Sequence, residues 1–125
     1  MTDLPLISIV DDDESVRESL PDLVRQFGFA AMAYASTEAF LASNGMRESR
    51  CLILDVNMPG MSGPELQLDL IARGHHVPIV FITVPGSPDI CQILLARGAV
   101  DCLFKPFSAA DLRSALTMAL EKDQI

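Results

Sequence analysis

The chain has 125 residues, half of them apolar, and a formal net charge of −8. This length and composition suit one domain whose hydrophobic core needs no metal or disulfide to fold. The acidic balance argues against direct binding to nucleic acid or to anionic membranes, because both need an excess of Lys and Arg.

The sequence also suggests where the protein works. It shows no signal-peptide pattern and no apolar run of bilayer length, so we expect a cytoplasmic protein that does not insert into membranes. It has no evident linker or repeat, so residues 1–125 are predicted to form one domain, with no output domain. Cys51, Cys91 and Cys102 share no metal-binding spacing, and we expect reduced core thiols.

Short apolar runs alternate with segments of helical period along the chain. In chain order, the pattern predicts a strand at 6–10, a helix at 15–27, a strand at 30–35, a helix at 37–42, a strand at 51–55, a helix at 64–72, a strand at 77–83, a helix at 88–97, a strand at 100–104 and a helix at 109–122.

Five apolar strands separated by helices indicate an α/β fold with a parallel sheet covered on both faces. Right-handed crossovers leave few arrangements, and the order 2-1-3-4-5 is the common doubly wound, flavodoxin-like solution. In such a sheet, ligands bind beyond the carboxyl ends of the strands, where the strand order reverses.

Polar residues stand at the ends of four predicted strands. They are Asp11 to Asp13 after the first strand, Asp55 at the end of the third, Thr83 at the end of the fourth and Lys105 after the fifth. Neighbouring strands lie about 4.8 Å apart, so these side chains should converge around Asp55.

Carboxylates held this close repel one another unless a cation lies between them. Mg²⁺ suits such oxygen ligands and leaves room for a phosphate oxygen. Asp55 could then act as a nucleophile and form an acyl phosphate, with positive charge from Lys105 and a hydrogen bond from Thr83.

Each of these features also has a simpler explanation when taken alone. An acidic run can cap a helix, and an Asp at a strand end can form a turn. Thr83 suits an ordinary strand, and Lys105 suits a solvated surface. The prediction therefore depends on all four features falling at neighbouring strand ends.

The segments around these residues resemble the receiver domain of two-component response regulators. They are IVDDDE at 9–14, LDVNMPGMSG at 54–63, FIT at 81–83, GAVD at 98–101 and KPF at 105–107. The resemblance covers essentially the whole chain and is nearest the FixJ-like branch. That branch normally carries a C-terminal DNA-binding domain, so we expect either a stand-alone receiver or a piece of a larger regulator.

The resemblance implies a phosphoacceptor and a magnesium site. Asp55 would be the phosphoacceptor, and Asp12 and Asp55 would bind Mg²⁺ directly. Asp11 would act through water and Asn57 through its backbone carbonyl. The phosphoryl donor would be a sensor histidine kinase or a histidine phosphotransfer protein. The domain would be a signalling domain that catalyses only its own phosphorylation and dephosphorylation.

The resemblance also implies a conformational switch, from which this sequence departs at two positions. Thr83 would be the switch hydroxyl, Lys105 would pair with the phosphoryl group, and the bond from Lys105 to Pro106 would be cis. Cys102 stands where the family usually has Phe or Tyr, and Val84 where it usually has Ala or Gly. We therefore expect a site that phosphorylates but couples unconventionally.

The helix predicted at 88–97 has an apolar arc of roughly 200°, wider than the stripe that a surface helix needs. Part of the arc should be exposed, so this fourth predicted helix and the fifth strand form a candidate face for a downstream protein or a self-dimer. Its residues are Ile90, Ile93, Leu94 and Arg97. Deeper burial beneath neighbouring loops is the alternative.

Three other functions remain as alternatives. A phosphohydrolase with an Asp nucleophile commonly needs a second acid two residues further on, where this chain has Asn57. A flavodoxin-like cofactor binder would need a phosphate-binding loop after the first strand, where Asp11 to Glu14 would repel phosphate. The third is a phosphorylation-independent adaptor on the same fold.

Overall fold

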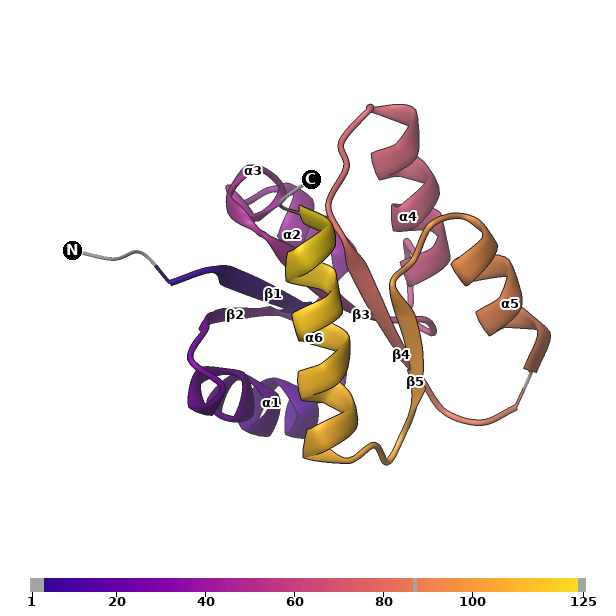
Figure 1. The fold of residues 1–125 in the computed structure, drawn as a ribbon. Coiled ribbons are helices and arrows are strands. Elements are labelled where there is room, and N and C mark those ends of the chain that lie inside the picture. The colour runs from indigo at the N-terminus through magenta and orange to yellow at the C-terminus, as the bar shows by residue number, and fades with distance from the viewer. Residues whose placement is uncertain (1–3, 87, 124–125) are drawn as a thin grey trace.

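The computed structural model describes residues 4–86 and 88–123 (Figure 1). All ten predicted elements are present, eight of them with bounds shifted by one or two residues, and one short helix, α3, was not predicted. The elements are β1 (Leu6–Val10), α1 (Glu14–Gln26), β2 (Ala30–Tyr34), α2 (Thr37–Leu41), α3 (Gly45–Glu48), β3 (Cys51–Asp55), α4 (Gly63–Ala72), β4 (Ile79–Thr83), α5 (Pro88–Ala96), β5 (Asp101–Phe104) and α6 (Ala109–Asp123).

The five strands form one parallel sheet in the order β2-β1-β3-β4-β5, which confirms the predicted topology. β3 lies in the centre and pairs with β1 and β4. Because all strands run the same way, their carboxyl ends meet at one edge of the sheet, where Asp55 ends β3 and Thr83 ends β4.

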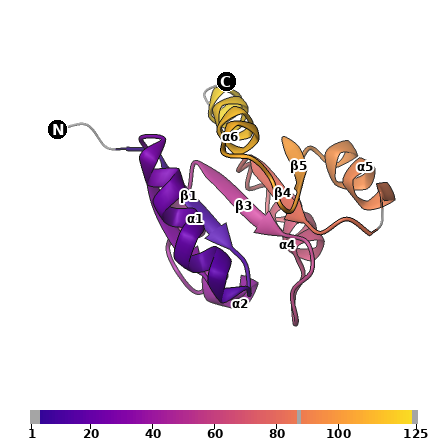
Figure 2. The ribbon, with the colours of Figure 1, turned by 90° about the horizontal axis from the view of Figure 1, so that it is seen from below.

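Alternate strand residues enter two separate cores, one on each face of the sheet. Helices α1 and α6 cover one face, and α2, α4 and α5 lie on the other side (Figures 1 and 2). The first core includes Ile9, Ile53, Ile82, Val24 and Leu116, and the second includes Leu52, Leu54, Phe81, Phe40, Leu66 and Leu94. Burial of each such side chain contributes about 1.5–3 kcal/mol, and together they hold the strand ends in position.

The described helices are short compared with a membrane span. The longest, α6, has 15 residues, whereas a span needs about 20 mostly apolar ones. None of the helices in the described part of the chain combines the length and apolar character needed to cross a membrane.

Candidate functional site

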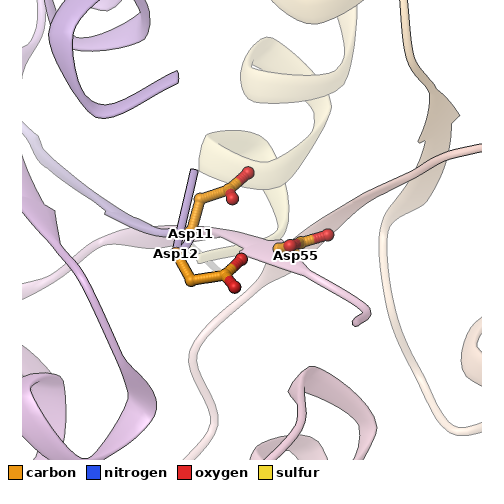
Figure 3. A group of neighbouring side chains, drawn as sticks. All are labelled: Asp11, Asp12 and Asp55. Carbon is orange, nitrogen blue, oxygen red and sulfur yellow. The ribbon is translucent and has the colours of Figure 1, made fainter. Parts of the chain in front are cut away.

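Three carboxylates gather at the carboxyl ends of β1 and β3 (Figure 3). One oxygen each from Asp11, Asp12 and Asp55 lie within 4.8 Å of one another. Asp11 is fully buried and Asp55 is only 6% exposed, whereas Asp12 is exposed to solvent. The structure thus brings together Asp11 and Asp55, which are 44 positions apart in the sequence but stand at the ends of two paired strands.

The loop after β1 is held by hydrogen bonds to its own backbone. The Asp13 N–H donates to Asp11 Oδ1 at 2.9 Å, and Arg17 Nη1 donates to the Asp11 carbonyl oxygen at 3.1 Å. Asp13 caps α1 by accepting from the Ser15 hydroxyl and backbone N–H, which hold the pKa of Asp13 below its usual value. The Asp13 side chain therefore caps the helix, while the carboxylates of Asp11 and Asp12 belong to the cluster.

Lys105 reaches the cluster from the far end of β5. Its Nζ lies 3.0 Å from Asp11 Oδ2 and 3.8 Å from Asp55 Oδ1. The peptide bond between Lys105 and Pro106 is cis. Partial burial alone would lower the pKa of Lys105, but the hydrogen bond to Asp11 and the nearby carboxylates raise it overall. The ammonium group therefore stays charged beside Asp55.

One lysine does not fully offset the negative charge at Asp55. Burial, followed by the charge of Asp11, raises the pKa of Asp55 to about 7, although Lys105 and the Asn57 N–H act in the opposite direction. A further cation would favour the ionised form. The ligands on offer are hard carboxylate oxygens, which suit Mg²⁺ better than a softer transition metal.

A cavity of about 460 Å³ opens beside the ends of β3 and β4. Its lining includes Asn57, Thr83, Val84 and Ile90. Thr83 is 3% exposed, and its hydroxyl donates to the Val84 carbonyl oxygen at 3.3 Å. Val84 is 56% exposed and contributes to the wall of this cavity. The cavity gives an incoming molecule access to the strand end that carries Thr83.

The segment between β3 and α4 is fixed by contacts that sequence reasoning did not identify. The Met61 N–H donates to Glu38 Oε2 at 3.0 Å, across 23 positions of sequence. A Cβ at Gly63 would overlap the carbonyl oxygen of Asp55, so only glycine lets α4 begin this close to the site. Ser62 and Glu65 form a capping box at the start of α4, which the Ser-x-x-Glu spacing could have revealed.

The structure corrects the proposed partner face at one residue. Leu94 is fully buried, so placing it on the surface was wrong. It belongs to the core formed with Leu66, Leu70 and Phe81, because α5 turns this side toward the sheet. Ile93 is 45% exposed and Arg97 is also exposed, whereas Ile90 is partly buried against the same core.

The expectation that all three cysteines are reduced thiols was also wrong for two of them. Cys91 on α5 and Cys102 on β5 form a disulfide, with their Cα atoms 5.7 Å apart. Cys51 is buried in the core and is not part of this bond. The spacing of 11 residues carries no signal in the sequence, because the pairing depends on how α5 folds back beside β5.

Comparisons with known proteins agree with this architecture. Residues 7–117 match the family described as the response regulator receiver domain. The chain belongs to this family. It is 41% identical over 116 residues to the response regulator protein TmoT of Ectopseudomonas mendocina, covering 93% of this chain and 53% of that protein. It is 37% identical over 114 residues to the transcriptional regulatory protein FixJ of Azorhizobium caulinodans, covering 91% and 54% respectively.

Solved structures show the same fold. The crystal structure of FixJ-N has a TM-score of 0.85 at 36% identity, with 97% of this receiver domain and 96% of that chain covered. The response regulator StyR has a TM-score of 0.89 at 39% identity, with 97% and 61% covered. The resemblance to the FixJ-like branch is thereby confirmed. The chain spans about half the length of the curated relatives that it matches.

Proposed function

We propose that Asp55 accepts a phosphoryl group, in the cytoplasm, from a phosphohistidine of a sensor histidine kinase or histidine phosphotransfer protein. The observation that carries this proposal is a nearly buried carboxylate at the end of the central strand, with two carboxylates and an ammonium group around it. In the transfer, an Asp55 oxygen bonds to phosphorus as the bond between phosphorus and the histidine nitrogen breaks.

Asp11, Asp12, Asp55 and the backbone carbonyl of Asn57 would hold Mg²⁺, since the three carboxylates already present oxygens within 4.8 Å of one another. When bound, Mg²⁺ neutralises charge on the phosphoryl oxygens. Lys105 offers a second positive charge, since its Nζ lies 3.8 Å from Asp55 Oδ1. For Thr83, the proposed role is to turn its hydroxyl from the Val84 carbonyl to a phosphoryl oxygen, which couples the modification to the end of β4.

The proposed response is a change of interactions at the α5–β5 face, defined here by Ile93, Arg97 and Phe104. Ile93 and Phe104 are 45% and 43% exposed, and both stand on elements that follow or precede the site directly in the chain. The partner would be a second copy of the domain or a downstream protein. Residues 1–125 would act as one receiver unit that passes the signal on without being an enzyme toward other substrates.

The test is incubation with a small phosphodonor and Mg²⁺, followed by intact mass measurement and peptide mapping. We expect one phosphoryl group per chain on the peptide that contains Asp55, and no label in Asp55→Asn. Asp22→Asn is the matched control, because Asp22 is an exposed aspartate on α1 that pairs only with Arg25 in the described structure. Undiminished labelling of Asp55→Asn would refute the assignment, and rapid turnover of a phosphomonoester would indicate a hydrolase instead.

A further inference from the structure

The disulfide between Cys91 and Cys102 ties the first half of α5 to the edge strand of the sheet. In Figures 1 and 2, α5 stands at the outer edge of the molecule, beside β5. The chain itself joins the end of α5 to β5 through the short turn that contains Gly98. The sulfur–sulfur bond therefore adds a second attachment at the opposite half of the helix.

The other contacts of α5 lie mostly in its second half, around Leu94. Leu94 is fully buried, and its carbonyl oxygen accepts a hydrogen bond from Gln67 Nε2 at 3.1 Å. Ile93 and Leu95 are more than 40% exposed and contribute little to holding the helix. Among the described side chains of the first half, only Ile90 and Cys91 pack toward the core. Breaking the disulfide would thus leave that half held by the packing of Ile90 and Cys91, without a covalent link to β5.

Cys102 also stands close in the sheet to the residues of the phosphoacceptor site. It lies opposite Phe81 on β4, and Phe81 stands two residues before Thr83. Three residues after Cys102 comes Lys105, whose backbone N–H donates to the Thr83 carbonyl oxygen at 2.7 Å. The disulfide therefore links α5 to a pair of strands that carry Thr83 and Lys105 at their ends.

We propose that Cys91 and Cys102 are a reversible thiol–disulfide site that locks α5 onto β5 when oxidised and releases it when reduced. The co-reactants are a low-molecular-weight thiol and its disulfide, such as the two forms of glutathione. Cys102 is the more exposed residue of the pair, since it is partly exposed and Cys91 is only 9% exposed. The thiol–disulfide chemistry is independent of phosphorylation. Its effect on signalling rests on the function proposed above, because Ile93 and Arg97 of the proposed partner face lie on or beside the locked helix.

The reduction proceeds in two exchange steps. A thiolate attacks the Cys102 sulfur, the bond between the protein sulfurs breaks, and Cys91 leaves as a thiolate that takes up a proton. A second thiolate then attacks the outer sulfur of the mixed disulfide, releasing Cys102 and a small disulfide. Two electrons and two protons pass to the protein for each bond broken, and oxidation is the reverse.

The covalent part is tested on the full chain in buffers of varied ratio of reduced to oxidised glutathione. After denaturation and alkylation, we expect one modified cysteine, Cys51, in the oxidised protein and three in the reduced protein. Peptide mapping should find Cys91 joined to Cys102 and the link should persist in Cys51→Ala. Absence of this link at every glutathione ratio, or a link that includes Cys51, would overturn the site.

The lock itself is tested by amide hydrogen exchange of oxidised and reduced wild-type protein, which needs no variant. Reduction should speed exchange at amides 90–95 by at least about threefold and leave those of α1 unchanged. The double variant Cys91→Ser, Cys102→Ser should exchange like the reduced protein in either buffer. Asp55→Asn should keep the full redox response, which separates this inference from phosphorylation. Equal exchange of α5 in oxidised and reduced wild type would overturn the lock.

Discussion

The acidic site and the α5–β5 edge differ in what holds each in place. Asp11 and Asp55 extend from β1 and β3, and each of these strands is paired on both sides within the sheet. Among the described strands β5 pairs only with β4, and α5 lies beside it with one buried leucine and one disulfide as its main attachments. The two carboxylates therefore stand at the ends of strands that are held from both sides, and the candidate output surface on an edge with fewer attachments.

The largest difference between the two regions is expected from adding one methyl group. Gly63→Ala should lower the free energy of unfolding by about 2–3 kcal/mol, because the new Cβ would overlap the Asp55 carbonyl oxygen, which cannot move within a paired strand. Gly86→Ala is the control near the α5–β5 edge, since a Cβ there meets nothing within 4 Å. It should stay within about 0.5 kcal/mol of wild type in urea denaturation. Equal stability of the two variants would show that the start of α4 does not pack closely against the Asp55 carbonyl oxygen.

The contrast also explains which features could be predicted from the sequence. The convergence of Asp11, Asp55, Thr83 and Lys105 follows from strand order alone, because parallel strands bring their carboxyl ends together. Strand order in turn follows from the apolar pattern and the handedness of the crossovers. A site whose residues are brought together by strand order can therefore be predicted from the sequence.

Features that depend on side-chain packing were missed. The disulfide, the burial of Leu94 and the hydrogen bond from Met61 to Glu38 all join segments whose mutual orientation has no local sequence signature. The apolar arc of α5 suggested an exposed surface but not which residues face inward. That choice is set by how the helix rotates against Phe81 and Leu66 in the core.

A second, smaller effect should come from removing the carboxyl group of Asp55, the proposed phosphoacceptor, in the absence of Mg²⁺. The pKa of Asp55 is raised to about 7 by burial and by Asp11, above its usual value of 3.8. The folded state therefore holds this proton more tightly than the unfolded state, and wild-type stability falls as pH rises between these two values. Asp55→Asn cannot ionise, so it should exceed wild type by about 1–2 kcal/mol near pH 8 and differ little near pH 4.

This pH dependence is measured by thermal or urea unfolding in a chelating buffer. Asp22→Asn serves again as the control and should follow the wild-type curve, because Asp22 lies on the exposed side of α1. An Asp55→Asn variant less stable than wild type near pH 8 would mean that the pairing with Lys105 outweighs the cost of burying the carboxylate.

A third prediction separates metal binding from simple charge. With Mg²⁺ at about ten times its Kd, the wild type should gain about 1.4 kcal/mol of stability. Asp12→Ala should lose this gain, yet match wild type without Mg²⁺, since Asp12 is exposed. Glu14→Ala removes an equal charge two residues away, outside the carboxylate cluster, and should keep the gain. Loss of the Mg²⁺ response in both variants would point to a diffuse charge effect rather than a site.

The smallest effect on stability is expected at the α5–β5 edge, where the consequence should be seen in association. Ile93→Glu should change the free energy of unfolding by less than about 0.5 kcal/mol, because the side chain is 45% exposed. It should weaken self-association of the phosphorylated protein, measured by analytical ultracentrifugation after treatment with a phosphodonor, while labelling of Asp55 stays intact. Met118→Glu is the matched control, since Met118 is 47% exposed on α6, the helix that covers the opposite face of the sheet. Equal loss of association in both variants would show that α5 is not the dimer surface. A phosphorylated wild type that stays monomeric would leave a downstream protein as the partner of this face.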